Sequence, residues 1–102
     1  MRRMLIIEAS QGARRRVAAV LRELGWDVIG VTDVRDGCAM FESQSPDAVL
    51  VGVLAPSDEG SLEALLRLAN QSDVPLLNLG MSLRGTSDEI EAIVRTIEIG
   101  QN

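Results

Sequence analysis

Short apolar runs alternate with amphipathic segments of helical length along the chain, and this alternation restricts the possible folds more than any other feature of the sequence. Four runs have the length and residue types of buried strands, and they cover residues 4–7, 26–31, 48–54 and 73–79. The third run, AVLVGVL, is the most hydrophobic and is typical of a strand at the centre of a sheet. Strands separated by helices indicate an α/β fold with a parallel sheet, right-handed crossovers and helices on both faces.

The segments between and after the runs carry apolar residues at helical spacing, so each predicts a helix with one buried face. Gly25 should end the first helix, Ser57 should cap the third, and the capping box Thr86-Ser-Asp-Glu89 should begin the fourth. The 102 residues are expected to form one domain without internal repeats. The expected apolar faces are Val17, Val20, Leu21 and Leu24 in the first helix, Val34, Cys38 and Phe41 in the second, Leu62, Leu65, Leu66 and Ala69 in the third, and Ile90, Ile93, Val94 and Ile97 in the fourth.

The composition limits the functions that the chain can have. Its net charge is −5, and it contains no histidine, lysine or tyrosine. Such a chain lacks the commonest general base and metal ligand, so we expect neither an enzyme nor a metal or cofactor site. The acidity and the presence of only two aromatic residues, Trp26 and Phe41, argue against nucleic-acid and membrane partners, and both rings are expected in the core. Cys38 is the only cysteine, which fits a cytoplasmic location, and the apolar run ending at Glu8 is too short for a signal peptide.

The functional crevice of an open parallel sheet lies at the carboxyl ends of its strands. These positions therefore decide what chemistry the chain can support. They are Glu8, Ala9 and Ser10 after the first strand, Thr32 and Asp33 after the second, Gly52 to Pro56 at the end of the third, and Gly80 to Ser82 after the fourth.

Residues 4–80 resemble a bacterial response-regulator receiver domain. The features that carry the resemblance follow the family's order: an apolar strand ending in Glu8, a helix running into Leu24-Gly25-Trp26, then Asp36-Gly37, Ser45-Pro46-Asp47, and Pro56 with Gly60. The segment SDVPLLNLG resembles the family's fourth strand. The resemblance implies a CheY-like fold of the flavodoxin type, a three-layer α/β arrangement with strand order 2-1-3-4. Residues 4–80 would form its core and residues 86–99 its C-terminal helix.

The chain is shorter than the family requires. Only residues 75–102 stand where receivers place a helix, a strand and a further helix, so one βα unit is missing and four strands replace the usual five. The strand over residues 73–79 would then be an open edge, which is a template for pairing with another chain. We therefore expect a homo-oligomer that associates through Val74, Leu76, Leu77 and Leu79.

The chain also departs from the family at the positions for phosphoryl transfer. The family's acidic pair maps to Glu8 and Ala9, its phosphoacceptor aspartate to Gly52 and its serine or threonine to Gly80, while its lysine has no counterpart. Phosphoryl transfer needs an oxygen nucleophile and a Mg²⁺ ion held by carboxylates. The resemblance thus implies a pseudo-receiver that binds proteins without being phosphorylated. Glu8 is either a remnant metal ligand, assisted by Asp33 or Asp58, or an anchor for backbone N–H groups, which is the commoner role.

The nature of the partner stays open at the level of sequence. The basic residues Arg14, Arg15, Arg16 and Arg22 predict a docking patch for an acidic protein, although a solvated helix face explains them equally simply. Alternatively, Gly52 and Gly80 leave room in the crevice for a small ligand or a nucleotide. The loop from Gly80 to Gly85 is a weak candidate for an anion site, because it lacks the lysine of a phosphate-binding loop.

Overall fold

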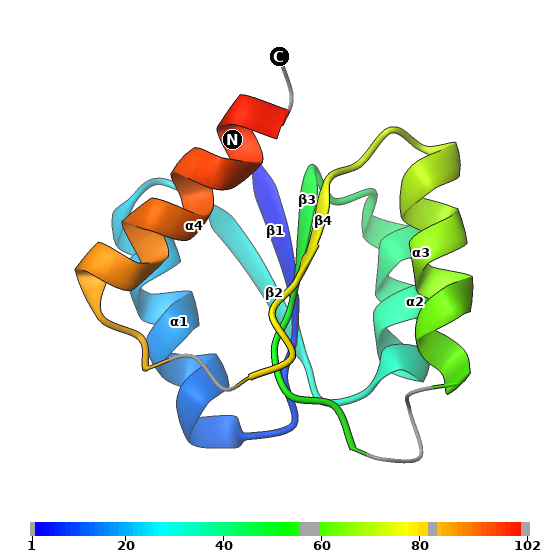
Figure 1. The fold of residues 1–102 in the computed structure, drawn as a ribbon, viewed down its shortest axis with the longest axis horizontal. Coiled ribbons are helices and arrows are strands. Elements are labelled where there is room, and N and C mark those ends of the chain that lie inside the picture. Colours follow the sequence, from blue (N-terminus) through cyan, green and yellow to red (C-terminus); the bar gives the residue numbers. More distant parts are fainter. Residues whose placement is uncertain (1, 56–59, 82–83, 101–102) are drawn as a thin grey trace.

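A parallel four-stranded sheet with the order β2-β1-β3-β4 forms the centre of the molecule (Figure 1). The computed structural model describes residues 2–55, 60–81 and 84–100. The α/β class and the strand order predicted from the sequence are confirmed. The strands are β1 (Arg3–Ile7), β2 (Asp27–Val31), β3 (Ala48–Val51) and β4 (Leu76–Asn78), and the helices are α1 (Gln11–Glu23), α2 (Val34–Gln44), α3 (Leu62–Gln71) and α4 (Ser87–Gly100).

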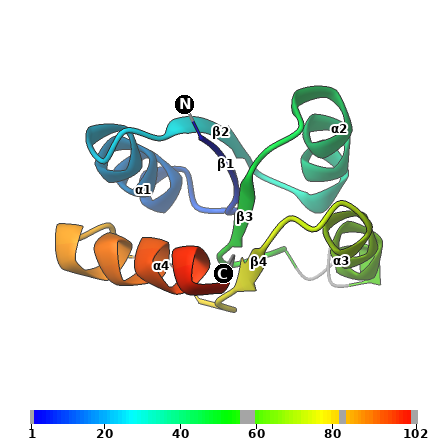
Figure 2. The same cartoon turned by 90° about the horizontal axis from the view of Figure 1, so that it is seen from above.

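Two pairs of helices cover the two faces of the sheet, α1 with α4 and α2 with α3 (Figure 2). The alternation of side chains along β1 divides its residues between these faces, because successive strand residues point in opposite directions. Met4 and Ile6 pack in the core under α1 and α4, whereas Leu5 and Ile7 pack under α2 and α3. All four are buried, which explains why this strand reads as a continuous apolar run.

Side-chain caps begin three of the helices, and one of these caps, at Thr86, is predicted from the sequence. Ser10 Oγ accepts a hydrogen bond from Ala13 N at 3.3 Å, and Asp33 Oδ1 accepts one from Asp36 N at 2.7 Å. Thr86 Oγ1 accepts from Glu89 N at 3.3 Å, as the capping box predicts. The Glu89 carboxylate, however, accepts from Gly85 N, one residue before the expected donor.

β3 and β4 are shorter than the apolar runs that contain them, so the predicted strand limits at 48–54 and 73–79 are wrong. β3 ends at Val51 and β4 covers only Leu76–Asn78. The start of β4 is displaced because Asp73 adopts a left-handed φ of 55° and Val74 N donates to Ala69 O. These residues complete the C-terminus of α3 before the chain can enter the sheet.

Two leucines that the helical spacing places on buried faces are in fact exposed. Leu24 is 41% exposed because α1 has already ended, and this residue is its C-cap. Leu66 is 43% exposed because it lies on the flank of α3, beside the stripe that contains Leu65 and Ala69. The predicted cap Ser57 lies outside the described residues. Trp26 and Phe41 are buried, as predicted.

The last helix crosses back to the face that carries α1, and β4 remains at the edge of the sheet. Ile90, Ile93, Val94 and Ile97 of α4 join the core that contains Val17 and Leu21 of α1. Figure 2 shows β4 at the sheet edge between α3 and α4, and no described strand pairs with its outer side. No helix in the described part of the chain is long and apolar enough to cross a membrane.

Candidate functional site

Glu8 is the only buried charged side chain among the described residues, with 1% of its surface exposed. It leaves the end of β1 and enters the crevice at the carboxyl ends of the strands. Its Oε2 accepts a hydrogen bond from Ser10 N at 2.7 Å, and its Oε1 accepts one from Val53 N at 3.3 Å. A buried carboxylate needs such donors to replace its lost hydration. Glu8 therefore connects the loop before α1 with the end of β3, as an anchor of the kind favoured by the sequence.

Gly52 lies directly against the Glu8 carboxylate. A Cβ atom at position 52 would stand 2.5 Å from Glu8 Oε1, which is closer than real Cβ atoms approach a neighbour, and 3.1 Å from Glu8 Cδ, which is a tight contact. The backbone of Gly52 stays in register with β1 because its N–H donates to Ile7 O at 2.9 Å. The space that a side chain would need at position 52 is thus filled by the carboxylate of residue 8.

The remaining acidic and glycine positions of the crevice serve turns and caps. Asp33 caps α2, as described above, and Asp58 lies outside the described residues. Gly80 has a left-handed φ of 65° and donates its N–H to Asn78 Oδ1 at 3.2 Å, which closes the turn after β4. Within residues 2–55, 60–81 and 84–100, no group of three or more histidine, cysteine, aspartate or glutamate residues could hold a metal ion.

A cavity of about 310 Å³ opens beside this turn at the end of β3 and β4. Three of its lining side chains are aliphatic and one is an amide. A site of this kind offers apolar contact with few groups for binding a phosphate. The lining residues are Gly52, Val53, Leu54, Leu62, Asn78 and Gly80.

The predicted arginine patch separates into two arginines that bind the chain's own backbone and two exposed ones whose side chains form no hydrogen bond or ion pair with another described residue. Arg14 Nη1 donates to Glu8 O at 2.8 Å, and Arg16 Nε donates to Arg84 O at 2.9 Å. The first of these bonds brings α1 against the loop that contains the buried carboxylate. Arg15 and Arg22 are exposed on α1, seven residues apart and hence on one helix face.

The predicted self-association residues are half-buried, and their side chains pack against the chain's own core. Val74 and Leu76 pack against the core under α2 and α3, whereas Leu77 and Leu79 pack against the core under α1 and α4. β4 has backbone groups on its outer side that no described strand pairs with. Because Pro75 O and Leu79 N bond to β3, strand alternation turns the N–H and C=O groups of Leu76 and Asn78 to the outer side.

Comparison with known proteins gives one similarity in sequence and several in structure. No protein-family model matches the chain. A probable transcriptional regulator, ycf27 of Porphyridium aerugineum, is 28% identical over 91 residues, which are 89% of this chain and 37% of the relative. The chain therefore spans little more than a third of the length of this relative.

Two solved receiver structures illustrate the similarity in fold. The receiver domain (CheY-like) from Methylobacillus flagellatus superposes with a TM-score of 0.67 at 18% identity, over 95% of this chain and 98% of that one. The signal receiver domain of a modulated diguanylate cyclase from Desulfovibrio desulfuricans G20 has a TM-score of 0.65 at 24% identity, over 97% of this chain and 76% of that one. The chain has the CheY-like fold of response-regulator receivers.

Proposed function

We propose that this chain is a cytoplasmic pseudo-receiver, a protein-interaction module of the two-component type that works without phosphorylation and is not an enzyme. The observation that carries the proposal is the position of the Glu8 carboxylate, which fills the space of a side chain at Gly52. The receiver fold supplies the context, and the contents of the crevice argue against its usual chemistry.

The chemistry of phosphoryl transfer explains the weight of this observation. A phosphoryl group needs an oxygen nucleophile to accept it and cations to neutralise the charge of its oxygens. Gly52 has no nucleophile, Ala9 has no metal ligand, and the chain has no lysine. The Glu8 carboxylate is already held by two backbone N–H groups. Without phosphorylation to switch it, such a module would present one conformation to its partners. The binding of partners would then be what regulates the module.

Acetyl phosphate with Mg²⁺ tests the proposal directly. We expect the intact mass of the protein to remain unchanged after incubation, while a phosphorylatable receiver in the same reaction gains a phosphoryl group. A stoichiometric mass increase on this chain would contradict the proposal.

Self-association through β4 is a further part of the proposal. Leu76 and Asn78 of one copy can pair with Asn78 and Leu76 of an antiparallel second copy, so each residue exchanges an N–H···O=C pair with its partner. Such a contact is self-complementary, as a two-fold dimer requires. The two sheets would join into one.

Proline at position 78 tests this pairing because it removes the outward N–H. We expect Asn78→Pro to shift the protein toward monomer in sedimentation at high micromolar concentration. Asn78→Ala is the matched control, since it loses the same side-chain bond to Gly80 but keeps the N–H. A wild-type protein that is strictly monomeric at this concentration would contradict the dimer.

The pattern of arginines on α1 supports a further proposal, that this helix binds an acidic protein partner. Arg15 and Arg22 would meet it, because Arg14 and Arg16 already bind backbone oxygens. The double change Arg15→Glu and Arg22→Glu should abolish capture of an acidic partner from a lysate of the source cells, and unchanged capture would exclude this face.

Binding of a small ligand in the crevice is the second candidate, favoured by the cavity beside Gly52 and Gly80. A thermal-shift screen with nucleotides distinguishes ligand binding from the protein-interaction module. A stabilising compound whose effect is lost in Gly80→Ala would favour ligand binding, and a screen without stabilisers would favour the interaction module.

A further inference from the structure

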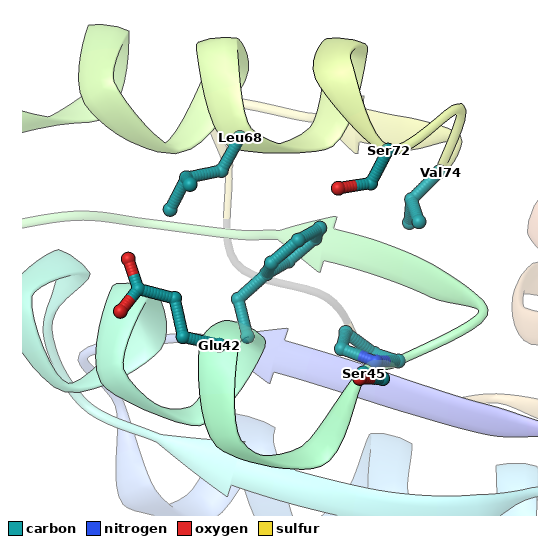
Figure 3. Close-up of a pocket in the computed structure, with 7 residues that line it drawn as sticks. Glu42, Ser45, Leu68, Ser72 and Val74 are labelled. Carbon is teal, nitrogen blue, oxygen red and sulfur yellow. The ribbon is translucent and has the colours of Figure 1, made fainter.

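A groove runs between the C-terminal halves of α2 and α3, at the end of the molecule opposite to the crevice (Figure 3). Its volume is about 340 Å³. Because Pro46 precedes β3 and Val74 precedes β4, the groove lies at the amino ends of the strands, away from Glu8. The lining residues are Phe41, Glu42, Ser45, Pro46, Leu68, Ser72 and Val74.

The groove exists because both helices end abruptly on left-handed residues. Ser45 has a φ of 48° and ends α2, and Asp73 has a φ of 55° and follows the C-cap of α3. At α3, Asp73 N donates to Asn70 O and Val74 N donates to Ala69 O, which is the pattern of a Schellman motif. The chain turns away sharply at both places and leaves an apolar floor between the helices.

The floor is aromatic and aliphatic, while polar side chains reach in from both helices. Phe41 is 6% exposed, and Leu68 and Val74 are half-buried. Figure 3 shows Leu68 and Ser72 extending from α3 toward α2, with Glu42 on the facing side. This arrangement can bury an apolar group and also offer a carboxylate and a hydroxyl at its rim.

The charge around the groove has one sign. Glu42 is exposed and forms no ion pair with any other described residue. The last turns of α2 and α3 contain no basic side chain, so the negative ends of both helix dipoles face the groove. The cations nearby are already paired, because Arg3 binds Asp27 and Gln44 O, and Arg67 lies 3.9 Å from Glu63. Asp73 adds an exposed carboxylate between two lining residues.

We propose that this groove binds a basic amphipathic segment of a protein partner. Apolar side chains of the segment would pack on Phe41 and Leu68. An arginine or lysine would lay its aliphatic stem along the floor and place its cation at Glu42. The inference rests on the proposed function as an interaction module and names the class of its partner. The groove lies on the face of the sheet opposite to α1 and its arginines, so the two surfaces are independent.

Selection from a random library of displayed 16-residue peptides on the immobilised full chain tests the proposal. We expect the enriched peptides to combine arginine or lysine with leucine, isoleucine or phenylalanine at helical spacing. In an amide NMR titration, one such synthetic peptide should shift Phe41, Ser45, Leu68 and Val74. Glu42→Lys should weaken its binding about tenfold.

Glu23→Lys is the matched control, since it makes the same change of charge on the exposed surface of α1 and should leave the affinity unchanged. Enrichment of acidic or uncharged peptides, shifts confined to the crevice or to β4, equal binding by the Glu42→Lys variant, or a library without binders would each overturn the proposal. Phosphorylation by acetyl phosphate would contradict the proposed function and leave this result unaffected, so the two failures are distinguishable.

Discussion

Glu8 and Gly52 are complementary to each other in size and chemistry. The longer acidic side chain reaches from β1 across the end of β3, and the residue without a side chain leaves it the space. An aspartate at position 8 would be one methylene shorter, and any side chain at position 52 would meet the carboxylate. The acidic residue that matches the expected receiver pattern and the glycine that departs from it thus form a single packed unit.

Gly52→Ala should destabilise the protein because the new Cβ must displace the buried carboxylate or the end of β3. We expect a loss of about 1–3 kcal/mol in the free energy of unfolding, measured with urea. Gly60→Ala is the control, since no atom of the described residues beyond its chain neighbours lies within 4 Å of its Cβ position, and it should change the stability by less than about 0.5 kcal/mol. Equal effects of the two substitutions would contradict the contact with Glu8.

The thiol of Cys38 reports on the groove between α2 and α3. Burial, and secondly the Glu42 carboxylate, raise the pKa of Cys38 above its ordinary value. A raised pKa means less thiolate at a given pH, so Cys38 should react with iodoacetamide at pH 8 more slowly than in the unfolded chain. Glu42→Gln should accelerate this reaction and Glu23→Gln should not. Equal rates in the wild type and Glu42→Gln would contradict the contribution of the carboxylate.

At the scale of elements, the contact between α1 and the loop before α4 depends on Gly85. This residue has a left-handed φ of 80°, and a Cβ there would stand 2.5 Å from Arg16 Cβ, an atom that cannot move without its helix. Arg16 also binds Arg84 O, so the loop and α1 are locked together.

Gly85→Ala should therefore cost more stability than Gly25→Ala. Gly25 has a φ of 93° but open space around its Cβ position, so its substitution carries only the backbone penalty of about 1–2 kcal/mol. We expect Gly85→Ala to lose about 1–3 kcal/mol beyond that penalty because of the overlap with Arg16. Thermal unfolding of the two variants measures the difference in their stability. Similar unfolding midpoints would show that the loop moves away from Arg16, and they would contradict the expected overlap.

The sequence predicts the elements well and their ends less well, for a physical reason. Periodicity and the capping box are local, so the apolar spacing indicates the helices and Thr86 marks the start of α4 correctly. The caps Ser10 and Asp33 are findings of the structure. The end of β3 and the start of β4 depend on which backbone groups meet across the sheet. The exposure of Leu66 depends on which side of α3 packs against α2 and the sheet, and no local pattern reports this.

The sequence predicts the separate roles of Glu8 and Gly52 in the candidate site, but it does not predict that the two residues contact each other. The resemblance to receivers implies that position 52 lacks an acceptor side chain, and a lone carboxylate at a strand end makes Glu8 a candidate loop anchor. That the anchor fills the empty position follows only from the side-by-side placement of β1 and β3. A glutamate at the end of one strand together with a glycine at the end of its neighbour is the signal that could have indicated it.

At the scale of the whole molecule, the three proposed contact surfaces are separate from the crevice that holds Glu8. In our proposals, the open edge of β4 pairs with a second copy, the exposed arginines of α1 bind an acidic protein, and the groove between α2 and α3 binds a basic one. They lie on different sides of the sheet (Figure 2). In this account, assembly replaces phosphorylation as the source of regulation.

The most direct test of the central claim is the amide NMR spectrum of the protein with and without beryllofluoride and Mg²⁺, the stable mimic of a phosphoryl group in receivers. Because Glu8 fills the space beside Gly52, the account predicts unchanged resonances for Ala9, Val53 and Gly80. Saturable shifts of these amides would show that the crevice accepts a phosphoryl mimic and would contradict the account.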